Sequence, residues 1–204
     1  MLILLLQMKN ALIILVHDSV PYDIKSGKVD IITDKESIAM RKQLLTHTHR
    51  ITVDINADKF LFINESSSDN DVWIKGDYIK RLQRGRGLGE KMANAFETVF
   101  SLGYSKVIMI GSDSIEIETD HLKHAFDYLD NYDIVIGPAQ EGGYYLIGMK
   151  KLHSVLFRYK AWNTPVLLHQ TLGDIAKLRL TYHLQQVLSD VEDEKEKYLL
   201  QHRQ

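Results

Sequence analysis

Cysteine is absent from the 204 residues, which excludes disulfide bonds and thiolate metal sites and fits a reducing compartment. Neither sign of charge dominates: the formal net charge is −2 and no basic stripe stands out, so we expect no nucleic-acid partner. Long apolar runs are also missing, because the N-terminal MLILLLQM is too short to span a bilayer and no small-residue cleavage site follows it. We therefore expect a cytoplasmic protein with no membrane span, in which residues 1–8 form an N-terminal extension.

The residues that are present suit a single globular domain. Hydrophobic residues make up 45% of the chain and charged residues 25%, which is enough to bury a core of ordinary size. No internal repeat, low-complexity tract or linker divides the sequence, and only NESSSDND at 64–71 has the composition of a flexible polar loop. The expected domain is therefore residues 9–204.

Four short runs are nearly continuous in apolar and β-branched residues. This pattern is typical of strands that are covered on both faces, as in parallel sheets. The runs are Ala11–Val16, Lys59–Ile63, Lys106–Ile110 and Asp133–Gly137.

Helical spacing of apolar residues separates these runs and predicts the fold class. Strands that alternate with helices indicate an α/β protein of three layers, a mostly parallel sheet with helices on both faces. Ligands bind such sheets beyond the carboxyl ends of the strands. The four expected helices are one after Asp34 with a stripe from Met40 to Ile55, one from Leu88 to a C-cap at Gly103, one after Thr119, and one opened by Thr164-Pro165.

Two of the predicted strands end at acidic residues that are candidates for a ligand site. Asp113, in Gly111-Ser112-Asp113, could hold a divalent cation that in turn holds a diphosphate, because Mg²⁺ and Mn²⁺ prefer oxygen ligands. An Asx-turn before the next helix would explain the same residue. In EGGYYLIG, residues 141–148, the paired glycines permit positive φ or close approach of the backbone to a ligand, although a plain hairpin turn is the alternative.

The segment RGRGLGEKM, residues 84–92, leads into a predicted helix. Helix N-terminal amides favour anions, so Arg84, Arg86 and Gly89 could bind phosphate. The glycine spacing does not match a dinucleotide fingerprint or a phosphate-loop motif. A flexible helix entrance with two solvated arginines is the alternative.

Taken in order, several segments resemble a known bacterial family of small glycosyltransferase-like proteins, often encoded beside radical-SAM/selenodomain proteins. That family consists of nucleotide-diphospho-sugar transferases with a GT-A-like fold, distantly similar to the molybdenum-cofactor and phospholactate guanylyltransferases. The resemblance covers nearly the whole chain, from about Lys9 to about Leu199. It rests on RGRGLGEKMANAF, KVIMIGSDSIEI, DIVIGPAQEGGYYLIGM, WNTPVLLHQTL and LSDVED.

The resemblance implies a role for individual residues. Asp113 would bind metal and diphosphate and, with Glu141, would be catalytic, and Asp190 would be a second metal ligand for Mg²⁺ or Mn²⁺. Glu141 stands where the family has Asp, and Glu192 where it has a second Asp after position 190. The substrate-binding positions implied by the match are Gly142, Gly143, Tyr144, Trp162 and Thr164.

The N-terminal loop departs from the family pattern. Family members have G-K-V-K-T-R-L after the first strand, whereas this chain has PYDIKSGKVDII. Lys25 and Lys28 keep a positive charge, but the Arg is absent, and Lys replaces a two-pronged phosphate donor poorly.

Three hypotheses for function follow. The first is a metal-dependent glycosyltransferase that uses a nucleoside diphosphate sugar and a small-molecule or glycan acceptor. The second is a nucleotidyltransferase of the guanylyltransferase type. The third is a binding domain that has kept the scaffold but lost turnover.

Overall fold

The structure is a computed structural model that describes residues 9–16, 22–23, 28–29, 35–64, 78–112 and 114–189. For residues 22–23, 28–29, 35–38 and 40–41 it describes the backbone alone. Four predicted site residues are affected. Lys25, Asp113 and Asp190 lie outside the described residues, and only the backbone of Lys28 is described.

The described part of the chain alternates strands and helices, as the sequence predicts. In chain order the elements are β1 (Asn10–Leu15), β2 (Tyr22–Asp23), β3 (Lys28–Val29), α1 (Lys35–Thr52), β4 (Asp58–Ile63), β5 (Tyr78–Leu82), α2 (Leu88–Ser101), β6 (Lys106–Gly111), α3 (Thr119–Asn131), β7 (Ile134–Pro138), β8 (Tyr144–Met149), the 3-10 helix η1 (Ser154–Phe157), α4 (Leu167–Lys177) and β9 (Tyr182–Leu184).

Seven strands form one sheet in the order β5-β4-β1-β6-β8-β7-β9. All neighbouring pairs are parallel except those of β8, which runs antiparallel to both β6 and β7. β2 and β3 pair separately as a short antiparallel ribbon. The mostly parallel sheet confirms the predicted fold class.

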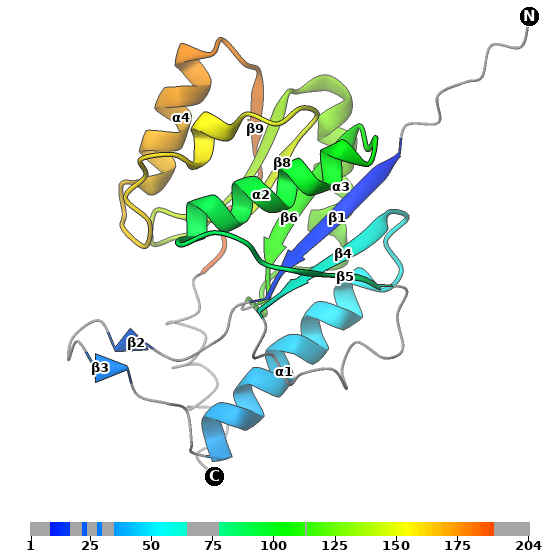
Figure 1. Cartoon of the computed structure of the whole chain (residues 1–204), viewed down its shortest axis with the longest axis vertical. Coiled ribbons are helices and arrows are strands. Elements are labelled where there is room, and N and C mark those ends of the chain that lie inside the picture. The colour runs from blue at the N-terminus through cyan, green and yellow to red at the C-terminus, as the bar shows by residue number, and fades with distance from the viewer. Residues whose placement is uncertain are drawn as a thin grey trace, which may run out of the picture.

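The sheet is buried on both faces because its central strands carry apolar side chains on both sides. Along β1, Ala11, Ile13 and Leu15 pack with α2, η1 and α4, whereas Leu12 and Ile14 pack with α1 and α3. Figure 1 shows α2 lying across the near face of the sheet. This two-sided burial explains why the strand sequences are nearly continuous in apolar residues.

The four predicted strands are present with ends shifted by one residue, but the sheet contains further strands. The edge strands β5 and β9 were not predicted, because edge strands need no continuous apolar run. β5 exposes Lys80, Arg81 and Leu82, and charged side chains of this kind also protect a sheet edge from pairing with other chains.

The helices follow the predicted periodicity with two corrections. α1 ends at Thr52, so Ile55 is buried in the same core cluster but lies beyond the helix. α4 begins at Leu167, two residues after Pro165, and its first turn is preceded by a bond from Leu167 N–H to the Thr164 carbonyl at 3.2 Å. Gly103 lies one residue beyond the α2 C-cap with φ of +88°, as expected for a helix-ending glycine.

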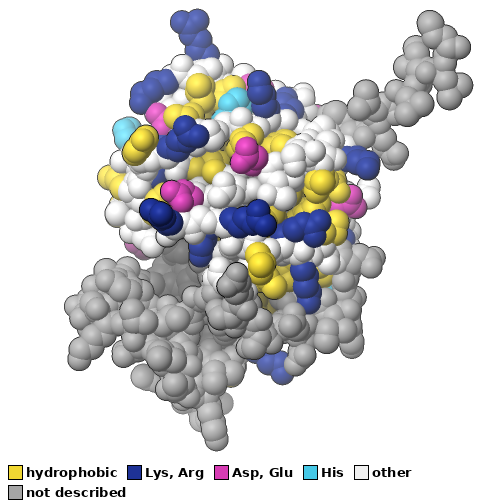
Figure 2. Space-filling model, in the orientation of Figure 1, with side chains coloured by type: hydrophobic (Ala, Val, Ile, Leu, Met, Phe, Trp, Pro, Cys, Tyr) yellow, Lys and Arg dark blue, Asp and Glu magenta, His cyan; other side chains and the backbone are white. Residues whose placement is uncertain are grey.

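Charged and apolar side chains are interspersed on the face that Figure 2 draws. Figure 2 shows Lys and Arg side chains spread over the described part of one face, with Asp, Glu and hydrophobic side chains between them. None of the helices in the described ranges is both long enough and apolar enough to cross a membrane.

Candidate functional site

A pocket of about 400 Å³ opens at the carboxyl edge of the sheet, where β1, β6 and β7 end and β8 begins. Its floor is formed by strand residues including Leu15, Met109 and Ile110. Two residues of α2, Leu88 and Met92, line one side. The remaining walls come from the β7–β8 turn, from residues 162–167, and from Ser114, Ile117 and Ser189.

The β7–β8 turn carries Glu141, Gly142 and Gly143, and its shape depends on Gly142. Gly142 N–H donates to the Ala139 carbonyl at 3.0 Å, and its φ is +90°. A Cβ at this position would overlap the backbone of Pro165, and the Gly142 carbonyl accepts from Leu168 N–H at 2.8 Å. Gly142 therefore fixes the turn and docks it against the start of α4.

Gly143 lines the pocket but is under no such constraint. It is not among the described glycines with positive φ, and a Cβ there would meet only Leu167 Cδ2 at 3.9 Å. The expectation that both glycines need special conformations thus holds for Gly142 alone.

Glu141 lies at the tip of this turn, on the rim of the pocket. Its side chain is exposed, and no described residue donates a hydrogen bond to its carboxylate. Among the acidic candidates, Glu141 is therefore the described carboxylate available to a ligand in the pocket.

A further wall is a loop that carries Trp162, Asn163 and Thr164, all of which line the pocket. Asn163 has a φ of +58°, a left-handed conformation that Asn tolerates better than most residues. Thr164 Oγ1 donates to the Ala161 carbonyl at 2.7 Å, so its hydroxyl is used within the loop. Trp162 packs edge-on to Tyr144, with ring centroids 6.4 Å apart.

Gly89 supports Trp162 from α2. A Cβ at Gly89 would overlap both the Phe157 carbonyl and the Trp162 ring. Close packing therefore explains this glycine without a phosphate, and its predicted role in phosphate binding stays a prediction.

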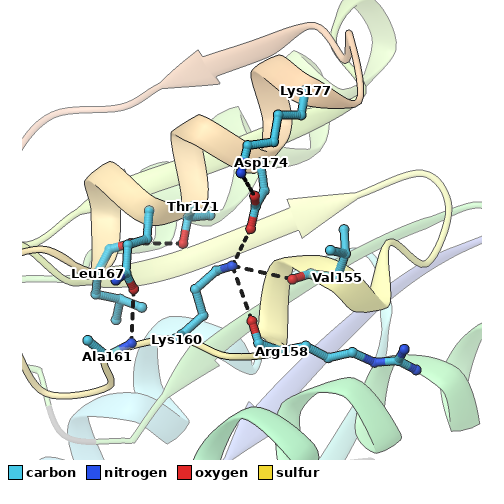
Figure 3. A network of polar contacts seen from close by, with 9 residues as sticks. Val155, Arg158, Lys160, Ala161, Leu167, Thr171, Asp174 and Lys177 are labelled. Carbon is cyan, nitrogen blue, oxygen red and sulfur yellow. Dashed lines mark hydrogen bonds and ion pairs between the residues drawn. The ribbon is translucent and has the colours of Figure 1, made fainter.

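Lys160 ties the same loop to η1 and α4, as Figure 3 shows. Its ammonium group pairs with Asp174 and donates to the carbonyls of Val155 at 3.3 Å and Arg158 at 3.4 Å, while its side chain is only 2% exposed. Hydrogen bonds from Lys160 and then from Lys177 lower the pKa of Asp174. No local pattern in the sequence marks this network, because Lys160 lies in a loop and Asp174 in α4.

The hydroxyl groups of the two tyrosines at the start of β8, Tyr144 and Tyr145, differ in their hydrogen bonding. The Tyr144 hydroxyl is buried and has no hydrogen-bond partner of good geometry in the described part of the chain; burial raises its pKa, although the neighbouring Thr171 hydroxyl offsets this in part. The Tyr145 hydroxyl donates to the Gln186 carbonyl at 3.1 Å, and burial raises its pKa to about 12. The Tyr145 ring occupies the space where a Cβ on Gly137 would lie.

Glu116 is a site residue that the sequence did not reveal. Its carboxylate accepts two hydrogen bonds from Ser189, one from the backbone N–H and one from Oγ, both at 2.7 Å. Ser189 lines the pocket and directly precedes Asp190, while Ser114, which also lines it, directly follows Asp113. Glu116 therefore joins the chain segments that flank the two predicted metal ligands.

None of the described Lys or Arg side chains lines the pocket. Arg84 and Arg86 are exposed in the connection between β5 and α2, just before Leu88, which does line it. Lys91, one turn into α2, donates to Asn64 Oδ1 at 3.4 Å beyond the end of β4, so it is a further cation at this edge that sequence reasoning missed.

The described residues alone do not compose a metal site. No group of three or more His, Asp or Glu residues in the described ranges could hold an ion. Glu141 offers one carboxylate, and the Glu116 carboxylate is already occupied by Ser189. A metal would therefore depend on Asp113 and Asp190.

Solved structures with the same fold extend over nearly the whole chain. A protein from Desulfovibrio desulfuricans G20, named as a candidate nucleotide-diphospho-sugar transferase, is 22% identical with a TM-score of 0.79, over 95% of this chain and 88% of that one. Rv0371c from Mycobacterium tuberculosis H37Rv is 11% identical with a TM-score of 0.57, over 95% and 98% of the two chains.

A third similar structure is a CMP:2-keto-3-deoxy-manno-octonic acid synthetase complexed with CTP. It is 9% identical with a TM-score of 0.56, over 95% of this chain and 98% of that one. At these identities the likenesses establish the fold. No curated protein matches the chain in sequence.

The family of the chain is shown by a sequence model of a protein family, whereas the distant structures show the fold alone. The family model matches residues 46–164, more than half of the chain, including the start of α2, the strand β6 and the β7–β8 turn. The matched segments are among those on which the sequence resemblance rests. The chain therefore belongs to the DUF2064 family, described as an uncharacterized protein group conserved in bacteria.

Proposed function

We propose that this protein is a metal-dependent transferase that moves a glycosyl group from a nucleoside diphosphate sugar to a small-molecule acceptor. The observation that carries the proposal is the pocket at the carboxyl edge of the sheet. It brings together the Glu141 turn, the Trp162 loop and the neighbours of Asp113 and Asp190, which are the positions that the family resemblance marks. The similar structure from Desulfovibrio desulfuricans supports the same class of reaction.

The donor would bind at the β1, β4 and β5 side of this edge. Arg84, Arg86 and Lys91 are available there, and Lys25 and Lys28 are further candidates from the altered loop. Cationic side chains bind phosphates well because hydrogen bonds between charged groups are stronger than those between neutral groups. Asp113 and Asp190 would hold Mg²⁺ or Mn²⁺, which when bound would offset the negative charge of the diphosphate.

Glu141 is the residue proposed to act on the acceptor. A carboxylate on the pocket rim can accept the proton of an acceptor hydroxyl, or orient that hydroxyl by a hydrogen bond. In the transfer, the acceptor oxygen forms a bond to the anomeric carbon as the bond from that carbon to the diphosphate oxygen breaks. The hydroxyl proton passes to Glu141, and the nucleoside diphosphate leaves with the electron pair.

Nucleotidyl transfer is the second candidate. The observation that favours it is the likeness to the CTP-bound synthetase, which places that activity on the same fold. Such an enzyme would bind a nucleoside triphosphate and release pyrophosphate. The third candidate, a domain without turnover, is favoured by the departures in the 19–32 loop alone.

A thermal-shift screen tests the proposal. UDP-, GDP-, CDP- and ADP-sugars and the free triphosphates would each be added with and without Mn²⁺. A ligand at about 100 times its Kd adds about 2.7 kcal/mol to the free energy of unfolding, which corresponds to a rise in Tm of about 5–10 °C for a chain of this size.

We expect one nucleotide sugar to give a Mn²⁺-dependent shift that Asp113→Asn abolishes. Asp120→Asn, on the exposed face of α3, is the matched control and should keep the shift. A shift with a triphosphate but with no nucleotide sugar would favour nucleotidyl transfer, and no shift with any nucleotide would favour the domain without turnover.

A further inference from the structure

The pocket that the proposed reaction assigns to the acceptor has an unusual balance of side chains. No Lys, Arg or His occurs among the described residues that line it. Most of the lining is apolar, including Leu88, Met92, Ile117, Tyr144 and Trp162. Arg84 and Arg86, in the connection that leads to Leu88, are exposed and are not among the lining residues.

Most polar groups on the pocket wall are already used within the protein. The Thr164 hydroxyl donates to Ala161, the Ser189 hydroxyl to Glu116, and the Tyr145 hydroxyl to Gln186. The Glu141 carboxylate and the Asn163 side chain are the two polar groups at the rim for which no described partner is present. Among the described residues, a ligand would therefore find a mostly apolar lining with one negative charge, that of Glu141, at the entrance.

From this arrangement we propose that the pocket binds a small molecule with a flat apolar body and a single amine or hydroxyl group, and with no phosphate or carboxylate. That this ligand is the acceptor rests on the proposed function. A phosphate or carboxylate placed here would lose its hydration without gaining a cationic side chain from the described lining, and it would be repelled by Glu141.

The same balance disfavours a sugar as the occupant. A ring that carries several hydroxyl groups needs a partner for each one that loses water, and unmatched polar groups are costly. An aromatic ring instead gains from contact with Trp162 and Tyr144, which already meet edge to face. An amine or hydroxyl at one end of such a ring would reach Glu141 at the rim.

The test uses small probes of one shape and different charge: 2-phenylethylamine, 2-phenylethanol, 3-phenylpropanoate and phenyl phosphate, with glucose and uridine as the sugar and nucleoside arms. Trp162 supplies the signal, because the sequence contains just two tryptophans and Trp73→Phe removes the other. Binding is followed by the change in Trp162 fluorescence in the full-length Trp73→Phe chain.

We expect the amine and the alcohol to bind, and the amine to bind at least about tenfold more tightly than the carboxylate. Glu141→Gln should remove the advantage of the amine over the alcohol while leaving alcohol binding in place. Glu97→Gln, an exposed residue on α2 outside the pocket, is the matched control and should change neither.

Gly143→Leu provides a second variant that fills the pocket without straining the turn, because a Cβ is tolerated at this position. It should abolish binding of every probe. The proposal is overturned if phenyl phosphate, 3-phenylpropanoate, glucose or uridine binds as tightly as the amine, if no probe binds, or if Gly143→Leu leaves binding unchanged.

The result is distinguishable from a failure of the proposed function. Donor binding is measured separately, by the Mn²⁺-dependent thermal shift. If the amine binds as expected while no nucleotide sugar does, the preference of the pocket stands and the transferase assignment fails. If a nucleotide sugar binds while the probes show no charge preference, the transferase stands and this inference fails.

Discussion

At the scale of single residues, the two adjacent glycines of the β7–β8 turn differ in whether a side chain could replace the hydrogen. Gly142 combines a φ of +90° with contact against the Pro165 backbone, whereas a side chain at Gly143 would meet nothing closer than 3.9 Å. Both glycines belong to one sequence motif, and both lie beside the same pocket. Conformation therefore requires glycine at position 142, and position 143 is open to change.

Gly142→Ala should lower the free energy of unfolding by about 2 kcal/mol or more, since it adds both a disfavoured φ and a backbone overlap. Gly143→Ala should change it by less than about 0.5 kcal/mol. Urea unfolding of the two variants beside the parent protein measures the difference. Equal losses would show that the turn does not depend on the φ of Gly142.

At the scale of elements, the pocket wall depends on the bonds that hold loop 158–164 to α4. Removing Asp174 leaves the buried Lys160 ammonium without its counterion, and removing Lys160 leaves the half-buried Asp174 carboxylate with the exposed Lys177 as its remaining cationic partner. We expect Lys160→Met to cost about 3–5 kcal/mol in unfolding free energy and to weaken ligand binding in the pocket. Asp120→Asn, from an exposed pair on α3, should cost less than about 1 kcal/mol.

The same pair predicts how stability depends on pH. The pKa of Asp174 is lower in the folded protein than its ordinary value of 3.8, because Lys160 and Lys177 stabilise the carboxylate. Its contribution is therefore complete above pH 3.8 and is lost as the pH falls through the folded value. Acid unfolding of Asp174→Asn beside the parent protein should show a smaller loss of stability below pH 3.8. Parallel curves would rule out this contribution.

A second link between elements is the Glu116–Ser189 contact, which joins the β6–α3 connection to the segment after β9. Glu116→Ala removes both acceptor oxygens, so the Ser189 amide should exchange with solvent about tenfold faster or more. Ser189→Ala keeps the backbone bond and should change the exchange of this amide much less. Amide exchange followed by NMR measures both variants, and an unchanged rate in Glu116→Ala would show that Glu116 does not hold this segment.

At the scale of the whole molecule, described cations and the mostly apolar pocket are neighbours along the carboxyl edge of the sheet. Arg84, Arg86 and Lys91 lie between β5 and the first turn of α2, and the pocket begins at Leu88 and Met92 of that helix and extends over the ends of β1 and β6. In the proposed transferase, the donor and acceptor sides would therefore adjoin at the start of α2.

Single Ala variants of Lys25, Lys28, Arg84, Arg86 and Lys91 test the donor side. A bond to a charged group is worth roughly 1.5–3 kcal/mol, so the variant that removes a phosphate contact should weaken nucleotide binding by about one to two orders of magnitude. Titration with nucleotide sugar and Mn²⁺ measures this. Lys151→Ala, at an exposed position after β8, is the control, and five unchanged curves would argue against the donor side.

The sequence by itself determined the fold class and four strands of the sheet. Strands such as β1 and β6 are buried on both faces, so they consist almost entirely of apolar residues, and this run can be recognised in the sequence. The sequence also placed Glu141 just past a strand end, where the carboxyl ends of neighbouring strands meet at one edge, whereas Trp162 was indicated by the family resemblance alone; both line the pocket. What it predicted of Asp113, Asp190 and Lys25 remains a prediction, because these residues lie outside the described part of the chain.

Only the tertiary structure decided which residues complete the site. Glu116 meets Ser189 across 73 positions, and Lys160 meets Asp174 between two elements, so no local spacing marks either pair. The order of the strands determines which segments come into contact. β8 lies antiparallel between β6 and β7, and the segment after β9 returns to the pocket. Hydrophobic periodicity indicates which face of each segment is buried, but it does not indicate which segments pack against one another. The reason is that the hydrophobic effect is non-directional: an apolar face is stabilised by any apolar surface that removes it from water.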